Sequence, residues 1–202
     1  AATPGSGLML PIEGALVTYV KPAVGSDPEG FFLQAEQAGP AIFVQMAAGT
    51  TSPAPQVGDE VRLTVEAVDT PASDGTVQVT AFSGYTNLSS GNDVTALTQD
   101  ISARTDVVTA LDEYESELIS VTGTVAGAFG FGGADHVSAD FATAGISGDP
   151  NLELRIPVAL RDMFDLVPGF DLVVLCADEP RGPDGIRIWT DRACRKTGVP
   201  WV

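Results

Sequence analysis

Residues 30–68 read GFFLQAEQAGPAIFVQMAAGTTSPAPQVGDEVRLTVEAV. Two runs rich in aromatic and aliphatic residues flank the Gly39-Pro40 pair, and this pattern predicts a β-hairpin over residues 31–47. After a loop rich in Pro, Ser and Thr, residues 61–68 alternate between apolar and polar side chains. Because successive side chains of a strand point to opposite faces, Val61, Leu63 and Val65 are expected on one buried face.

Further strands are expected on both sides of this stretch. Residues 15–23 (ALVTYVKPA) predict a first strand, and residues 76–82 (TVQVTAF) predict a strand after the Asp74-Gly75 turn. Five strands within about 70 residues, separated by turns, are typical of a small barrel or sandwich. Residues 1–14 are small and apolar, and they precede the first strand as an N-terminal extension.

The second half repeats this order after a change of pattern. Residues 94–117 predict a partly helical connector that ends in a run of acidic residues, which we interpret as a solvated face. Strands are expected again at 118–125, 136–143, 152–158, 171–177 and 185–190. We therefore predict an all-β fold of two tandem five-stranded Greek-key barrels of the oligonucleotide/oligosaccharide-binding (OB) type. The expected divisions are an extension at 1–14, a first barrel at 15–93, a connector at 94–117 and a second barrel at 118–202.

The charge balance limits the classes of partner. The 202 residues include 27 acids and 10 bases, for a formal net charge of −17. Such a surface repels phosphate backbones, so nucleic acid is an unlikely partner. No run of 18 or more apolar residues predicts a membrane span. No cofactor is expected. A Ca²⁺ site stays open, because acidic turns are present although none has the spacing of a Ca²⁺-binding loop.

Positive charge is concentrated near the C-terminus. The basic residues of this patch are Arg181, Arg187, Arg192, Arg195 and Lys196. Three interpretations remain: a solvated hairpin, a groove for an anion or oligonucleotide, or one side of a head-to-tail contact with the acidic body of another copy. The apolar N-terminal residues could add a strand to the sheet of such a neighbour. These residues are Leu8, Met9, Leu10 and Ile12.

Two features favour an exported protein. The chain begins with Ala1 rather than Met, as a mature product does after removal of a signal peptide. Cys176 and Cys194 are the two cysteines, and in an extracellular protein we expect them to form a disulfide. We therefore expect an extracellular or cell-surface location.

The sequence offers no recognisable catalytic set. His136 is the single histidine, and no G-x-S-x-G motif accompanies the serines. Residues 127–133 (GAFGFGG) lack the Lys of a phosphate-binding loop and predict a hairpin tip. Phe129 and Phe131 would be exposed at this tip as a contact site. We expect a protein that is not an enzyme.

Three sequence words carry a resemblance to a known family. Gly30-Phe31-Phe32-Leu33-Gln34, Ile42-Phe43-Val44 and Val57-Gly58-Asp59-Glu60-Val61 resemble OB-fold modules of secreted bacterial proteins, the non-catalytic domains that accompany extracellular nucleases. Residues 114–121 also look like the entry to a second module. The resemblance implies the fold more than a ligand.

Two functions follow as expectations. The first is a secreted structural or interaction protein, a self-assembling subunit of a filament or surface layer that binds itself or other cell-surface proteins. The alternative is an OB-type module that binds an oligosaccharide or, less readily, single-stranded nucleic acid. Its ligand face would include Phe31, Gln34, Phe43 and Gln45.

Overall fold

The chain folds mainly into β-strands, as the sequence predicts. The computed structural model describes residues 5–69 and 76–160. The strands of the first half are β1 (Gly5–Lys21), β2 (Gly30–Gln34), β3 (Ala41–Gln45), β4 (Glu60–Asp69) and β5 (Gln78–Ser89). None of the helices within the described ranges is long and apolar enough to cross a membrane.

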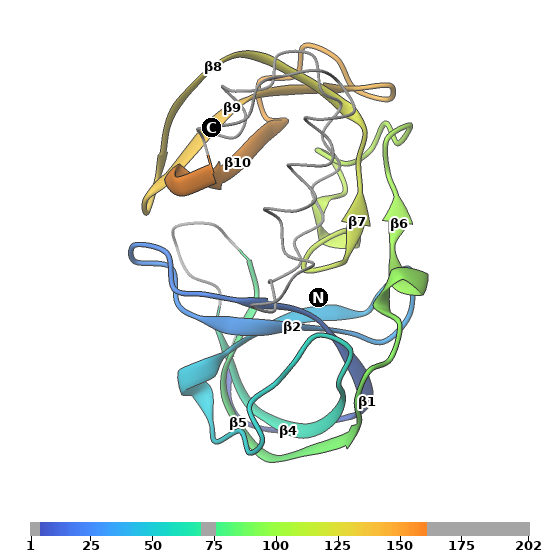
Figure 1. Ribbon diagram of the computed structural model, residues 1–202, viewed down its shortest axis with the longest axis vertical. Helices are drawn as coiled ribbons and strands as arrows, with labels where there is room; N and C mark the ends of the chain where they lie inside the picture. Colours follow the sequence, from blue (N-terminus) through green and yellow to red (C-terminus); the bar gives the residue numbers. More distant parts are fainter. Residues whose placement is uncertain (1–4, 70–75, 161–202) are drawn as a thin grey trace, which may run out of the picture.

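The first five strands close into a barrel, in the order β1-β2-β3-β5-β4 (Figure 1). Strands β2 and β3 form the expected antiparallel hairpin around Gly39-Pro40, with Phe32 paired to Phe43. Strands β3 and β5 pair in parallel. A short 3-10 helix, η1 (Met46–Ala48), follows β3 and packs against the core.

Alternation along the strands produces the barrel core. Val61, Leu63 and Val65 are buried on β4, whereas Arg62 between them is exposed, so the predicted faces are confirmed. Phe31 of β2 lies in the same core and meets two further aromatic rings edge-on. Each fully buried side chain of this size contributes about 1.5–3 kcal/mol through loss of apolar surface from water.

Strand β1 begins far earlier than the sequence predicts, and this corrects the expected N-terminal extension. From Gly5 to Leu16 it pairs with β4, and from Leu16 to Lys21 it pairs with β2. The register shifts between Glu13 and Ala15, where Gly14 adopts a φ of +107°. Such a bulge bends a strand, which lets β1 serve both neighbours and close the barrel. From Gly5 onward, the segment expected to donate a strand to another copy belongs to its own barrel.

The connector contains short turns rather than long helices. Its elements are η2 (Val94–Leu97), β6 (Gln99–Asp100), η3 (Leu111–Glu113) and β7 (Ile119–Ser120). Asp93 caps η2 by accepting a hydrogen bond from the Thr95 N–H. Strands β6 and β7 pair in parallel as a separate two-stranded sheet. The expected helical content is thus limited to 3-10 turns.

The second half forms an antiparallel sheet in the order β10-β9-β8, with β8 at Gly123–Gly133, β9 at His136–Thr143 and β10 at Glu153–Pro157. The strands expected at 171–177 and 185–190 lie outside the described residues. The glycine-rich segment at 127–133 is part of β8 and not a hairpin tip. The turn lies at Ala134 and Asp135, whose positive φ values of 45° and 57° suit a two-residue hairpin loop.

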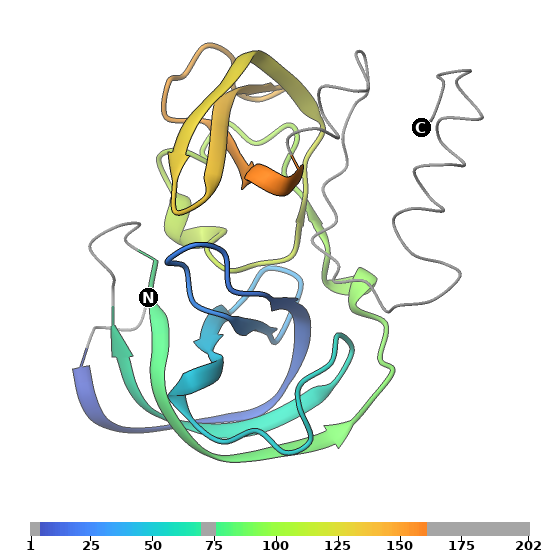
Figure 2. The ribbon, with the colours of Figure 1, turned by 60° about the vertical axis from the view of Figure 1, so that its left-hand side comes forward.

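The β8–β10 sheet stands over one end of the barrel in both ribbon views (Figures 1 and 2). The loop between β1 and β2 meets the β8–β9 turn there. A Cβ on Gly25 would lie 2.8 Å from the Ala134 carbonyl, so only glycine fits this approach. Asp27 Oδ2 lies 3.8 Å from both Arg155 Nη1 and His136 Nδ1. These contacts fix the two halves against each other.

Candidate ligand-binding site

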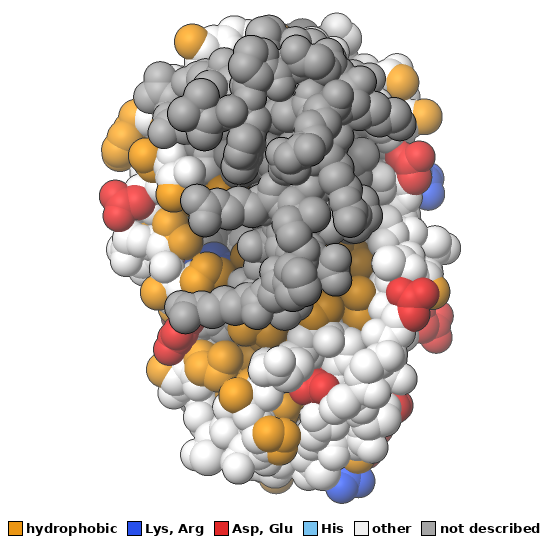
Figure 3. All heavy atoms as spheres, viewed as in Figure 1, with side chains coloured by type: hydrophobic (Ala, Val, Ile, Leu, Met, Phe, Trp, Pro, Cys, Tyr) orange, Lys and Arg blue, Asp and Glu red, His pale blue; other side chains and the backbone are white. Residues whose placement is uncertain are grey.

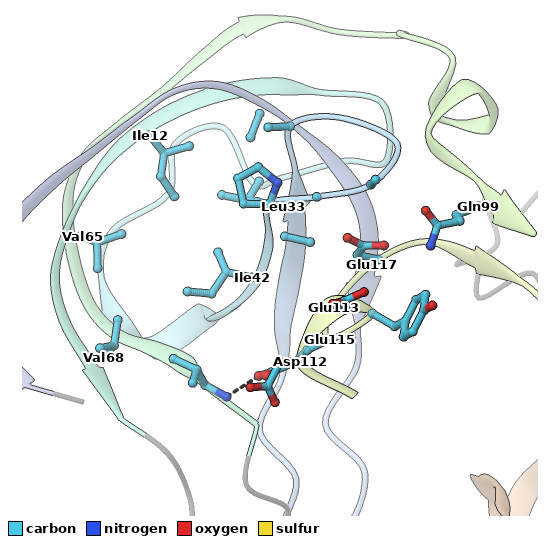
Figure 4. A pocket seen from close by; sticks show the side chains of 18 of the residues that line it. Ile12, Leu33, Ile42, Val65, Val68, Gln99, Asp112, Glu113, Glu115 and Glu117 are labelled. Atoms are coloured by element: carbon cyan, nitrogen blue, oxygen red, sulfur yellow. Dashed lines mark hydrogen bonds between the residues drawn. The ribbon is translucent and has the colours of Figure 1, made fainter. Parts of the chain in front are cut away.

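A cavity of about 670 Å³ lies at the end of the barrel where β2 turns into β3 (Figure 4). Barrel strands form one wall and residues of the connector form the other. In Figure 3, apolar side chains gather around the middle of the visible face, between the barrel below and the β8–β10 sheet above. We call this cavity the barrel mouth.

The barrel side of the mouth is apolar. Ile12, Leu33, Ile42, Val65 and Val68 line it from strands β1, β2, β3 and β4. These positions face the core, and Leu33, Ile42 and Val68 each lie one residue from the end of their strand. The neighbouring strands of the barrel cover most of the surface of these side chains, and the remaining surface faces the cavity. The result is a concave apolar wall of the kind that holds the body of a small ligand.

The opposite wall is acidic, and Figure 4 shows its carboxylates facing the apolar strands. Its acids are Asp112, Glu113, Glu115 and Glu117. Two hydrogen bonds hold this segment in place. Buried Tyr114 donates from its hydroxyl to Asp106 Oδ1 at 2.8 Å, which raises the pKa of the phenol. Glu115 Oε1 accepts from the Val77 N–H at the start of the β5 segment.

Gln34 joins the acidic wall to the barrel. Its side chain is fully buried, and its Oε1 accepts from the Leu118 N–H at 2.7 Å. Its Nε2 lies 2.9 Å from the Glu36 carbonyl oxygen and 3.2 Å from that of Leu97. The sequence placed Gln34 on a ligand face. In the structure its hydrogen bonds instead connect β2 to the connector segment next to the mouth.

Glu117 is the carboxylate of the mouth that has a buried oxygen without a hydrogen-bond partner among the described residues. Its Oε2 is inaccessible to solvent and has no hydrogen-bond partner among the described residues. Its Oε1 lies so close to the turn that a Cβ on Gly39 would be 2.6 Å away, and Gly39 has a φ of +76°. Burial raises the pKa of Glu117 above its ordinary value. A positive group placed in the mouth would remove this cost.

Two other residues of the expected ligand face, Phe31 and Phe43, are also buried. Phe31 is fully buried, and Phe43 is 4% exposed with its ring 4.9 Å from that of Phe32. Gln45 donates from Nε2 to Gln78 Oε1 at 3.0 Å. Buried aromatic rings are not available as stacking platforms, so the prediction is wrong for Phe31 and Phe43, whereas Gln45 is partly exposed.

The expected contact residues at the N-terminus are divided between two environments. Leu8 and Ile12 pack against the barrel core. Met9 is 72% exposed, and Leu10 is half exposed at the edge of the mouth. The structure therefore uses part of this set internally and leaves Met9 on the surface.

In the second half, Phe131 is 93% exposed on β8, whereas Phe129 is half-buried. His136 is buried at the start of β9, and its Nδ1 donates to the Ala134 carbonyl oxygen at 2.7 Å. Within the described ranges, no three His, Cys, Asp or Glu side chains gather as a metal site. The Ca²⁺ site stays a prediction. Cys176, Cys194 and the basic patch at 181–196 lie outside the described residues.

Sequence reasoning missed the barrel mouth. The acids at 112–117 were interpreted as a solvated face, and nothing local distinguishes Glu117 from its neighbours. The contact that buries Glu117 comes from the Gly39-Pro40 turn. This turn is far from the acid run in the chain, so no local pattern connects the two. Comparison with known proteins supplies no further guide: no family model, no curated protein and no solved structure matches the chain.

Proposed function

We propose that this chain is a non-enzymatic binding module whose ligand enters the barrel mouth. The observation that carries the proposal is the cavity itself, about 670 Å³ with one apolar and one acidic wall. Small-molecule sites are typically concave, mostly apolar and about 300–1,000 Å³ in volume, with a few polar groups that orient the ligand. The mouth has each of these properties.

An OB-like identity for the barrel is part of this proposal. Five strands in the order β1-β2-β3-β5-β4 support it, because the OB fold is a five-stranded Greek-key barrel. The sequence words at 30–34 and 57–61, which resemble modules of secreted bacterial proteins, fall on β2 and on the start of β4. The proposed site differs from the expected ligand face on β2 and β3, because Phe31 lies in the barrel core and Phe43 is only 4% exposed.

A neutral, environment-sensitive dye such as Nile red tests the proposal on the full chain. We expect one dye per chain, with increased fluorescence on binding. Ala38 lies on the β2–β3 turn, lines the mouth and is exposed, so Ala38→Trp should fill the cavity without disturbing the core. This variant should weaken binding at least about tenfold, a change of about 1.4 kcal/mol.

Ala47→Trp is the matched control, because Ala47 is exposed and does not line the mouth. It should bind the dye as the unmodified chain does. Thermal melts of both variants show whether the fold is retained. Equal binding by the two variants, or no binding by the unmodified chain, would refute the proposal.

A second candidate function is a self-associating structural subunit, as the sequence first suggested. The observation that favours it is Phe131, 93% exposed on a strand that, within the described sheet, pairs only with β9. Exposed strand edges and large exposed apolar side chains both favour association between chains. Export to the cell surface and a disulfide between Cys176 and Cys194 remain predictions that belong with this candidate.

A further inference from the structure

We propose that the ligand of the barrel mouth is an amphiphilic cation, a small molecule with an aliphatic body and a protonated amine that pairs with Glu117. The inference rests on the proposed binding function and names the chemical class of the ligand. Its aliphatic part would lie against Ile42, Leu33 and Val65, which face Glu117 across the mouth in Figure 4.

The first argument is the unmet hydrogen-bonding capacity of Glu117. A carboxylate oxygen without a partner, removed from water, has a high free energy compared with the solvated group. Oε2 of Glu117 is in this position among the described residues. The terminal torsion of a glutamate is broad, so the carboxylate can turn Oε2 toward the mouth. A protonated amine there, with three donors on a compact charge, would supply both the missing hydrogen bond and the missing charge. A neutral apolar ligand would supply neither.

The second argument is the sign of the charge around the mouth. Four carboxyl groups line it, against one guanidinium, that of Arg104. Within the described residues, the ion pairs join Asp27 to His136 and to Arg155, and none joins Arg104 to the carboxylates of the mouth. No close partner among the described residues therefore neutralises the charge of this wall. An anionic ligand would be repelled, so the site selects against it as well as for a cation.

The third argument is the position of the carboxylate. Gly39 has no side chain, and its backbone approaches Glu117 so closely that any Cβ would collide with Oε1. The Glu117 carboxylate thus lies directly against the β2–β3 turn, and both residues line the mouth together with Leu33 and Ile42 of the apolar wall. A ligand whose charge sits at one end of an aliphatic chain matches this division, since its two parts meet the two walls at once.

Three linear ligands of eight carbons with different head groups test the inference: octylamine, octanol and octanoate. We would titrate each into the full chain at neutral pH by isothermal calorimetry. Octylammonium should bind at least about tenfold more tightly than octanol, and octanoate should bind most weakly. Glu117→Gln should remove the preference for octylammonium over octanol. Glu153→Gln, at an exposed position on β10, should leave it unchanged.

The outcomes separate the two proposals. If no member of the series binds, the proposed binding function fails. If all three bind equally, or if Glu117→Gln retains the preference, the binding function stands and the inference about the cation is overturned. Should Glu117→Gln fail to fold, the unmodified chain still gives a test. Acidification through the pKa of Glu117 must abolish the preference for octylammonium and leave the affinity for octanol unchanged.

Discussion

Replacing Gln34 by leucine should open the junction between the barrel and the acidic wall. The two side chains are similar in size, so the substitution leaves little empty volume and chiefly removes hydrogen bonds. Gln34 Oε1 accepts from the Leu118 N–H at 2.7 Å, and Nε2 donates toward the carbonyl oxygens of Glu36 and Leu97. In Gln34→Leu the Leu118 N–H and the Leu97 carbonyl lose the partner that Gln34 provides, whereas the Glu36 carbonyl still accepts from the Gly39 N–H.

The magnitude follows from the cost of each unmet group. An orphaned buried N–H costs about 1–3 kcal/mol, and each lost net hydrogen bond about 1 kcal/mol. The orphaned N–H of Leu118, at about 2 kcal/mol, and the lost hydrogen bond to the Leu97 carbonyl, at about 1 kcal/mol, therefore predict a loss of about 3 kcal/mol in the free energy of unfolding. For a chain of this length, a loss of about 1 kcal/mol lowers Tm by about 2–4 °C, so a decrease of about 6–12 °C is expected.

Urea and thermal unfolding of the full chain measure this loss, with Gln37→Leu as the control. Gln37 is exposed and makes one hydrogen bond, from Nε2 to the Thr98 carbonyl oxygen at 2.9 Å, so its replacement should cost less than about 0.5 kcal/mol. Hydrogen exchange at the Leu118 amide should accelerate in Gln34→Leu. If Gln34→Leu is as stable as Gln37→Leu and the Leu118 amide stays protected, Gln34 does not join the acidic wall to the barrel.

Two further predictions concern ionisation and association. Burial raises the pKa of Glu117, so the folded state holds this proton more tightly than the unfolded state. The stabilisation is complete below the unfolded pKa and is lost as the pH rises through the folded pKa. Glu117→Gln should therefore gain stability relative to the unmodified chain between acidic and neutral pH, and urea melts across this range that show the opposite trend would contradict it. Phe131→Ser, at an exposed position, should change the free energy of unfolding by no more than about 0.5 kcal/mol; if β8 is an interface, light scattering should show less self-association, and an unchanged mass would remove β8 from consideration.

Features set by neighbouring residues could be predicted from the sequence. The β2–β3 hairpin and strand β4 depend on alternation and on turn residues, both of which act over a few positions. The start of β1 could not be predicted in this way, because Pro11 and Gly14 look like strand breakers. Within the described sheet, the first part of β1 pairs only with β4. An edge strand tolerates proline, and a bulge uses glycine.

The barrel mouth depends on contacts between distant parts of the chain, and for that reason the sequence did not reveal it. Whether an acid in the 112–117 run is solvated or buried is decided by what packs against it. For Glu117 this neighbour is Gly39. Likewise, the sequence shows Phe43 as an aromatic residue of a strand but does not say on which side of the closed barrel it lies. Both questions are answered by topology rather than by composition.

The hydrogen bond between Gln34 and Leu118 also imposes an order of events on folding. It joins residues that are 84 apart in the chain, and closing a loop of that length costs about 4 kcal/mol in chain entropy. One hydrogen bond cannot offset this cost. Once β5 is in place up to Ser89, only the stretch from there to Leu118 remains to be closed. Because residues 112–118 follow the five barrel strands in the chain, the barrel strands are synthesised before the acidic segment that lies opposite their apolar end.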